Sequence, residues 1–525
     1  MIASMKITED YWTGFNIEQS DIEFIYNLLL EKATPIKSEE LLKALVTYRI
    51  EEEAARLQES ANSRGAIYLP KDDFNKGDNL VFPAFSMQKG KVTAVRSGFN
   101  PEYEDLKVIE VKMETGDTHS FAANLPDHPL NQAIEIDEND PNRNPEAVIA
   151  QHGALLKTRL SEALKSQDDL VKIAGNWFPR SLLVDIGVGY LNLAEAVLEE
   201  ANGGPLSIVE LMKQVELEAD ENDKLMEFSF DLALQDDKRF DEVGPAGETL
   251  WFLHDMEPDD VKQCPIFLKY TPREYSCEGL DKYLELFEGT LYDEFETWDS
   301  PHANGDEISV SLIYPHWRSG TLPLSNSLRE FFPTAHEAPR VNFTFVDELT
   351  GDRFGGWVVR PFNYIYGLAD WYKEHEIMPG SVLKVKKSKN PGEIIICFDK
   401  SRQNKEWLKT VLIGSDQGIV FAMLKHNINA DFNERMAVAI PDVAAVDEIW
   451  KNKVYEKEPI TKTILRITRE LAKLNPQGQV HAQELYAAIN VVRRCPPSLI
   501  LYHLLNEASI SHLGDLYFHF SEKEA

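Results

Sequence analysis

Residues 221–253, ENDKLMEFSFDLALQDDKRFDEVGPAGETLWFL, decide the fold of the middle of the chain. Apolar residues recur there at intervals of three and four, which predicts a helix over 225–235. Two short strands are expected to follow, over 240–243 and 249–253, and Gly244-Pro245-Ala246-Gly247 supplies the turn that joins them. A helix that leads into a tight hairpin is typical of the second half of a winged helix.

The segment just before this stretch supplies another helix, from Ile208 to Val215, with Ser207 as its N-cap. Together the two segments resemble the HARE helix-turn-helix family, the winged-helix module of the RNA polymerase delta subunit, over about 194–257. The matching motifs are Pro205–Leu211, Phe228–Leu234, Asp237-Lys238-Arg239-Phe240, Val243-Gly244 and Leu250-Trp251-Phe252-Leu253. The resemblance implies a module that binds DNA or docks on transcription machinery such as RNA polymerase.

The hairpin has two cations at its start and apolar residues along it. Phe240 and Trp251 are expected to pack the hairpin on the helices, and Lys238 and Arg239 stand where phosphate contact is feasible. The alternative for Arg239 is an ion pair with a nearby acid. Between residues 194 and 262 there are 20 acidic and 5 basic residues. So acidic a module suits a basic protein partner better than phosphate.

A second resemblance covers about 320–396. Its motifs are Gly320–Ser325, a short helix over 328–332, VNFTFVDELTGDRFGGWVVR at 341–360, Tyr366–Tyr372 and Met378–Leu383. Their order is similar to the B-three-type pseudobarrel of plant transcription factors and related restriction enzymes. Ser381 stands where that family has an acidic turn residue. The resemblance implies a β-rich domain that contacts duplex DNA.

Residues 320–400 are electrically neutral, with 10 basic and 10 acidic residues. They include the cations that we expect to contact nucleic acid: Arg353, Arg360, Lys384, Lys386, Lys387 and Lys389. Arginine can read base edges or hold phosphates. The alternative is a solvated strand edge that its lysines protect from aggregation.

The C-terminal segment, 451–525, has 10 basic and 8 acidic residues. Its expected elements are helices over 460–474, 482–490 and 499–508 and a final strand over 515–520, which is a second winged-helix order. The helix over 499–508 has no Lys or Arg, so Arg493 and Arg494 are the candidates to hold phosphates at its start. A purely structural or protein-binding role is the alternative.

The whole chain is therefore predicted to be an α+β multidomain protein, with winged-helix units, a small SH3-like β-barrel and a β-rich pseudobarrel. The expected domains are 1–64, helical and suited to a winged helix or a helical hairpin; 65–132, the β-barrel; 133–146, a linker; 147–260, helical with the HARE-like unit; 261–400, the pseudobarrel; 401–450, a helical connector that includes a helix over 405–412; and 451–525, the C-terminal unit. Residues 266–270, IFLKY, are expected to form a strand.

Several classes of function lack support in the sequence. No nucleotide-binding glycine loop, metalloprotease motif or nucleophile elbow is present, so we expect neither catalysis nor a cofactor nor a metal. The 4 cysteines, an acidic N-terminus and the absence of a long apolar run predict a cytoplasmic protein without a membrane span. The net charge of −33 excludes a protein that contacts DNA over its whole surface.

The function predicted from these observations is a non-enzymatic, transcription-associated or DNA-binding scaffold. It would contact duplex DNA through its neutral and basic patches and a basic protein through its acidic unit. Two alternatives remain: a protein-interaction adaptor without affinity for nucleic acid, and a non-catalytic subunit of a restriction or defence system.

Overall fold

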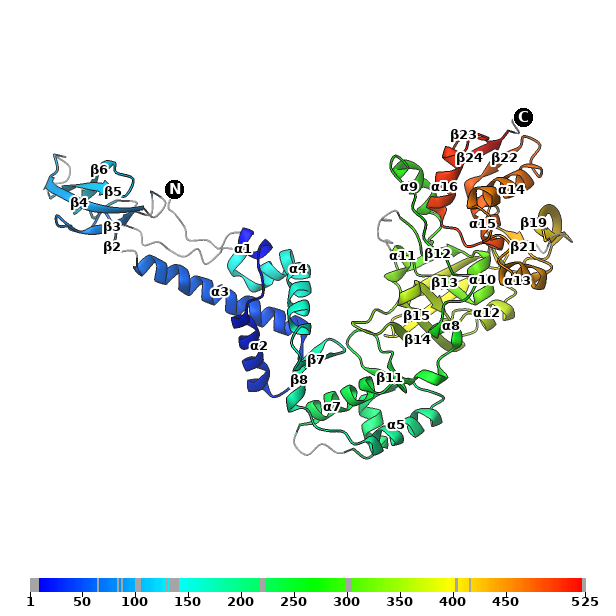
Figure 1. Cartoon of the computed structure of the whole chain (residues 1–525), viewed down its shortest axis with the longest axis horizontal. Helices are drawn as coiled ribbons and strands as arrows, with labels where there is room; N and C mark the ends of the chain where they lie inside the picture. Colours follow the sequence, from blue (N-terminus) through cyan, green and yellow to red (C-terminus); the bar gives the residue numbers. More distant parts are fainter. Residues whose placement is uncertain are drawn as a thin grey trace. The chain divides into compact units, whose positions relative to one another are not determined.

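The computed structural model describes residues 9–521 apart from 64–65, 83–84, 86–87, 100–104, 129–130, 132–140, 218–221, 298–304, 402–404 and 415–416. The chain divides into two units, Met1–Val184 and Asp185–Ala525 (Figure 1). Both combine helices with sheets, which confirms the predicted α+β multidomain class. Most of the predicted linker lies outside the described residues. Within the described ranges, no helix is both long and apolar enough to cross a bilayer.

The helical part of the first unit is formed by the N-terminal and C-terminal segments of that unit. Its elements are α1 (Glu9–Thr13), α2 (Gln19–Lys32), β1 (Ile36–Lys37), α3 (Ser38–Ser63), α4 (Pro145–Lys165), β7 (Leu170–Ile173) and β8 (Asn176–Pro179). The strands pair in the order β1-β8-β7. Residues 1–64 are therefore not a complete domain, because the strand partners of β1 lie beyond residue 169. Residues Ser38–Ser63 form one continuous helix, since no glycine or proline interrupts them.

Residues 66–123 form a five-stranded sheet between α3 and α4 in the sequence. Its strands are β2 (Ala66–Ile67), β3 (Asn79–Phe82), β4 (Gln88–Ser97), β5 (Lys107–Met113) and β6 (Thr118–Ala123), in the order β2-β3-β4-β5-β6. Tyr68, Phe82, Val92 and Ile109 are buried on one side of this sheet. The β-structure predicted for this part of the chain is confirmed.

The stretch quoted first lies in a compact group at the start of the second unit. This group contains α5 (Val188–Glu200), β9 (Leu206–Ser207), α6 (Ile208–Gln214), α7 (Asp223–Asp236), β10 (Phe240–Glu242) and β11 (Leu250–Leu253), with sheet order β10-β11-β9. Ser207 caps α6 as predicted, and Glu210 accepts a hydrogen bond from the Ser207 amide in return. The predicted order of helix, helix and hairpin is thus observed.

Residues 307–398 form an open, seven-stranded half-barrel sheet. Its strands are β12 (Glu307–Ser311), β13 (Thr321–Pro323), β14 (Arg340–Asp347), β15 (Arg353–Val359), β16 (Tyr364–Tyr366), β17 (Val382–Lys387) and β18 (Glu393–Phe398), in the order β12-β17-β18-β14-β15-β16-β13. The short helices α10 (Tyr314–Ser319), α11 (Asn326–Arg329) and α12 (Ala369–Glu374) lie between strands in sequence. Alternate residues of β14 are buried, as expected for a sheet with one covered face.

Two sequence predictions in the second unit are wrong. Residues 266–270 form no strand: they precede α9 (Asp281–Glu288), follow the short helix α8 (Asp259–Lys262), and are bracketed by Pro265 and Pro272. Residues 405–412 are not helical. They belong to β19 (Glu406–Ile413), which pairs with β20 (Ile419–His426) and β21 (Val438–Ala439), because strand partners on both sides outweigh the local helix pattern. In the described part of 401–450, the helix of the connector is α13 (Val443–Lys451).

The C-terminal group contains α14 (Ile460–Ala472), β22 (Gln479–His481), α15 (Ala482–Val492), α16 (Pro497–Asn506), β23 (Ile510–Gly514) and β24 (Tyr517–Phe520), with sheet order β22-β24-β23. It has the three predicted helices and the predicted final strand, together with two strands, β22 and β23, that were not predicted. Its buried residues share one large core with β19, β20, α9, α10 and α13. The C-terminal group is therefore packed firmly into the second unit.

Three groups of elements in this chain have the same topology. In each, a helix, a short strand, two helices and two strands follow one another, and the last strand lies in the middle of the three-stranded sheet: α2 to β8, α5 to β11, and α14 to β24. The register places Trp177 opposite Ile36, Trp251 opposite Leu206, and Phe518 opposite Val480. All three aromatic side chains are fully buried. The 66–123 sheet is inserted between the second and third helices of the first group.

Candidate interaction sites

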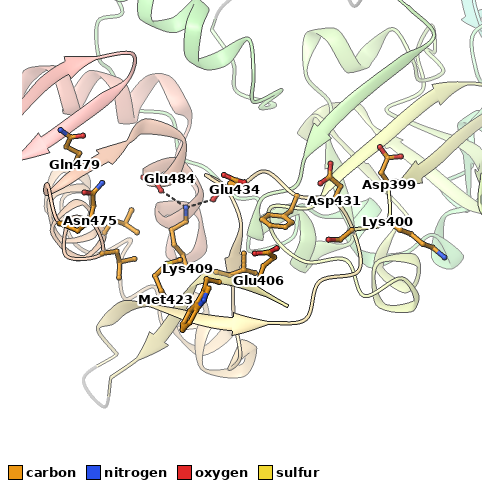
Figure 2. A pocket seen from close by; sticks show the side chains of 17 residues that line it. Asp399, Lys400, Glu406, Lys409, Met423, Asp431, Glu434, Asn475, Gln479 and Glu484 are labelled. Atoms are coloured by element: carbon orange, nitrogen blue, oxygen red, sulfur yellow. Dashed lines mark hydrogen bonds and ion pairs between the residues drawn. The ribbon is translucent and has the colours of Figure 1, made fainter. Parts of the chain in front are cut away.

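A groove of about 1140 Å³ lies between the β19–β20 hairpin and the C-terminal group (Figure 2). Trp407, Lys409 and Met423 of the hairpin line it on one side. The end of α14, the loop after it and the start of β22 line another side with Leu471, Leu474, Asn475, Pro476 and Gln479. Residues 399–401 and 431–434 complete it. Nothing in the local sequence predicted this groove, because it depends on a strand that was expected to be a helix.

The amine of Lys409 is buried in the groove wall and fully occupied. It donates to the carbonyl oxygens of Glu434 and Arg435 at 3.2 and 2.7 Å and to the Glu484 carboxylate at 3.0 Å. Burial lowers the pKa of Lys409, and Glu484 opposes that shift. An ammonium group has three protons, and three acceptors receive them here. Lys409 therefore joins the 434–435 loop to α15 and is poorly placed to act as a nucleophile.

The group from α5 to β11 is called the acidic group below, because its segment has a large excess of acidic residues. In this group, the Arg239 side chain is held mainly by acids. It donates to both oxygens of Asp237, to Asn192 at 3.0 Å and to the Glu195 carboxylate. Its guanidinium also lies over the Phe240 ring, 5.3 Å from the centroid. Arg239 thus connects the hairpin to α5, which is the alternative considered from the sequence.

Trp251 joins the hairpin to α7 through a buried hydrogen bond. Its indole N–H donates to the Asp231 carboxylate at 2.7 Å, and both side chains are buried. Burial raises the pKa of Asp231 to about 7, although the Trp251 hydrogen bond favours the charged form. Gly244 permits the close approach of the hairpin arms, because a Cβ there would lie 2.1 Å from the Glu248 carbonyl oxygen.

The tip of this hairpin is held against the half-barrel. The Val243 carbonyl accepts from the Asn342 amide at 2.9 Å, and the Ala246 amide donates to Thr334 at 2.5 Å. Phe252 packs edge-on against Trp357, with ring centroids 5.1 Å apart. The β10–β11 hairpin is therefore part of an internal contact with the half-barrel.

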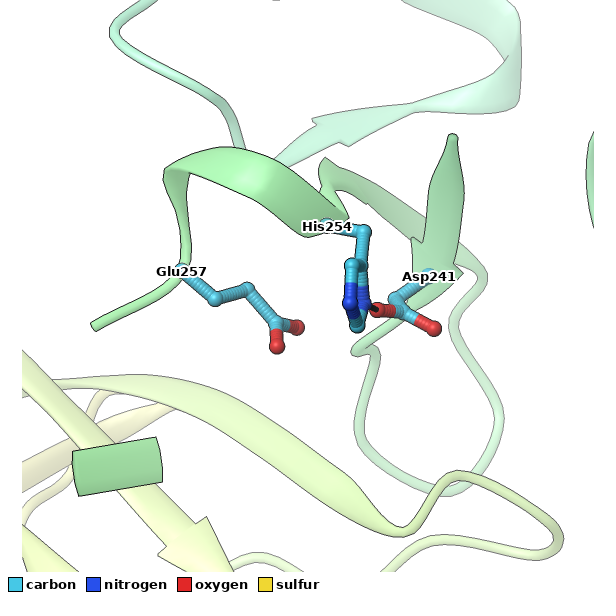
Figure 3. A group of neighbouring side chains, drawn as sticks. All are labelled: Asp241, His254 and Glu257. Carbon is cyan, nitrogen blue, oxygen red and sulfur yellow. Dashed lines mark hydrogen bonds and ion pairs between the residues drawn. The ribbon is translucent and has the colours of Figure 1, made fainter. Parts of the chain in front are cut away.

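Asp241, His254 and Glu257 form a small cluster at the same contact (Figure 3). His254 Nδ1 lies 2.6 Å from an Asp241 oxygen, and Glu257 points toward the pair. Two carboxylates and an imidazole are a donor set that suits a divalent metal. However, Arg340 pairs with Asp241 at 2.9 Å and with Glu257 at 3.1 Å. A guanidinium between the carboxylates disfavours a second cation, so we interpret the cluster as an ion-pair contact with the half-barrel.

Three of the six cations expected to bind nucleic acid on the half-barrel are paired with acids. Lys384 pairs with Asp399 at 2.7 Å, and Lys386 with Glu348 at 2.8 Å. The two arginines also have acceptors, whereas the other two lysines are exposed. Arg353 pairs with Glu393, Arg360 donates to the Ala338 carbonyl at 2.7 Å, Lys387 lies 5.0 Å from the centre of the Phe331 ring, and Lys389 is exposed. The β17 lysines do lie close together, but between acids of neighbouring strands.

Arg493 and Arg494 are buried, so they cannot hold phosphates in this structure. Arg494 donates two hydrogen bonds of 2.7 Å to Asp293 and pairs with Glu294 at 2.8 Å. Arg493 donates to the carbonyl oxygens of Tyr455 and Glu458, both at 2.9 Å. In the sequence, two adjacent arginines before a helix resemble a phosphate-binding site. In the structure, segments far away in the chain supply their hydrogen-bond partners instead.

The helix α16, at whose start we expected Arg493 and Arg494 to hold phosphates, is covered by another part of the chain. The Tyr275 hydroxyl lies 2.7 Å from the Ser498 hydroxyl, and the Tyr275 ring packs on Tyr502. Leu284 and Phe287 of α9 share a core with Leu499 and other residues of α16. Because of this cover, α16 does not present a free face of the kind that enters a DNA groove.

Comparison of the chain with protein-family models, curated proteins and solved structures gives no match. The two family resemblances therefore remain predictions.

Proposed function

We propose that this chain is a protein-interaction adaptor in which three winged-helix units act as docking and structural modules. The observation that carries the proposal is that most of the cations expected to bind nucleic acid are buried or paired. Of the eight expected to contact nucleic acid, two are buried and most of the others are paired with acids or carbonyl oxygens. A DNA-binding surface needs cations that are free to replace counterions.

The three repeated groups support the winged-helix assignment, since each has the helix and strand order of that motif. The 66–123 sheet is proposed to be the SH3-like barrel and the half-barrel to be the B-three-type domain. In the HARE-like group, α7 contains Asp223, Glu227 and Asp236 against one cation, Lys224, while its fourth acid, Asp231, is buried. An acidic third helix attracts a basic surface on a partner protein. The partner that the family resemblance implies is RNA polymerase.

The test is a titration of labelled duplex DNA with the full chain at low salt. We expect no saturable binding, and the same result after charge reversal of Lys384, Lys386 and Lys387. Tight binding that weakens steeply with salt, and that these charge reversals reduce, would contradict the adaptor and favour the DNA-binding scaffold. Cross-linking to purified RNA polymerase then tests the partner, with cross-links expected within residues 194–262.

DNA binding by the half-barrel is the second candidate. It is favoured by the position of Lys384, Lys386, Lys387 and Lys389 at one end of β17 and just beyond it. The titration above decides between the two functions.

A further inference from the structure

We infer that the groove beside the β19–β20 hairpin binds an extended, basic segment of a partner protein. This inference rests on the proposed adaptor function and names the chemistry of one partner. It follows from three properties of the groove: its apolar wall, its unpaired carboxylates and its size.

The apolar wall is exposed to a degree that folding does not require. The Trp407 side chain is 58% exposed and Met423 is 41% exposed, on the face of the hairpin that lines the groove. Leu471 and Leu474 face them from the C-terminal group. Exposed aromatic and methionine side chains in a hollow are typical of surfaces that bind other chains. The Lys425 amine already lies 5.3 Å from the Trp407 ring centroid, so this ring accepts a cation.

The carboxylates determine the charge of the ligand. Five acids line the groove, against Lys400 and Lys409. Asp399 and Glu484 already have lysine partners, Lys384 and Lys409. Glu406, Asp431 and Glu434 make no ion pair within the described part of the chain. Three unpaired carboxylates beside an aromatic ring favour arginine or lysine side chains and repel the phosphates of nucleic acid.

The size of the groove favours a peptide over a small molecule. Its volume of about 1140 Å³ exceeds the usual range for small-ligand pockets, roughly 300–1,000 Å³. It is also open and lined by many polar groups. An extended chain with alternating side chains can place apolar residues on Trp407 and Met423 and cations at the rim.

The probe is a fluorescein-labelled peptide of about ten residues that alternates arginine with leucine and carries a photo-cross-linker. Its counterpart has glutamate in place of arginine. Binding to the full chain is followed by anisotropy, and the cross-linked residues are mapped by mass spectrometry. We expect the basic peptide alone to bind, with cross-links on the groove residues.

Two pairs of variants make the test specific. Neutralising the three unpaired acids (Glu406→Gln, Asp431→Asn, Glu434→Gln) should weaken binding about tenfold or more and flatten its salt dependence. Neutralising three exposed acids elsewhere in the same unit (Glu285→Gln, Asp352→Asn, Glu374→Gln) should leave the affinity unchanged. Trp407→Ala should also weaken binding, whereas Leu412→Ala, on the opposite face of the same strand, should not.

Each outcome separates this inference from the adaptor function. Binding that survives the groove variants, with cross-links at 194–262, would overturn the groove and leave the adaptor intact. No binding of the basic peptide at low salt would overturn the groove as well. The adaptor itself is judged by the DNA titration, which does not involve the groove.

Discussion

The Arg494 guanidinium donates two hydrogen bonds of 2.7 Å to the carboxylate of Asp293, 201 residues earlier in the chain. Both side chains are fully buried, and Tyr486 donates a further hydrogen bond to Asp293. Glu294 pairs with the same arginine and with His316. This network joins the C-terminal group to the segment that follows α9.

Arg494→Met should destabilise the Asp185–Ala525 unit by about 3–5 kcal/mol, because it leaves buried carboxylates without their cation. Calorimetry of the full chain, with the transitions assigned by hydrogen exchange, measures the loss. Arg353→Met removes an arginine from an exposed pair and should have a much smaller effect. Equal losses of unfolding free energy from the two substitutions would mean that the buried network stabilises the unit no more than an exposed ion pair does.

Asp231 predicts a dependence of stability on pH. Burial raises its pKa to about 7 in the folded chain, whereas an unfolded aspartate titrates near 4. The folded state therefore holds a proton that the unfolded state has released between these values, and stability falls as pH rises from about 4 to 7. The loss from this group is about 4 kcal/mol, since each pKa unit corresponds to about 1.4 kcal/mol.

Asp231→Asn should make the unfolding free energy less dependent on pH over that range. Burial also raises the pKa of Glu242 to about 8 and that of Glu257 to about 7, so a weaker slope should persist. Asp223→Asn, at the exposed start of the same helix, is the control and should keep the original slope. If Asp231→Asn left the slope of unfolding free energy against pH unchanged, Asp231 would not be the group that causes it.

Gly244→Ala should destabilise the hairpin of the acidic group by about 1–3 kcal/mol, since the new Cβ would collide with the Glu248 carbonyl oxygen across the turn. Gly189→Ala is a matched control in the same group. Its Cβ meets nothing within 4 Å, and alanine favours the helix α5 by about 0.5–1 kcal/mol. Thermal unfolding of both variants gives the comparison, and a neutral Gly244→Ala would show that the arms can separate.

Trp177→Ala and Phe518→Ala test whether the repeated groups depend on equivalent aromatic residues. Each substitution removes a fully buried ring and should cost about 3–5 kcal/mol. The first should lower only the transition of the Met1–Val184 unit, and the second only that of the Asp185–Ala525 unit. Hydrogen exchange in the two halves of the chain separates the effects, and a loss in the other half would contradict the division.

Much of the secondary structure could be predicted where the signal is local. The helix that Ser207 caps follows from residues within four or five positions of each other, and the hairpin around Gly244 from strands that a short turn joins. The segment 405–412 shows the limit of such signals. Its apolar spacing suits a helix, but partners in β20 and β21 make it a strand, and the groove exists only because of that pairing.

The sequence by itself determined the positions of most helices, the three helices and final strand of the C-terminal group, and the concentration of acidic charge around residues 194–262. Only the tertiary structure decided that β8 completes the sheet of β1 and that Arg494 is neutralised by Asp293. The physical reason is distance along the chain. Helix periodicity and caps arise from neighbouring residues, whereas the surroundings of a charge depend on segments that folding brings together from more than a hundred residues away.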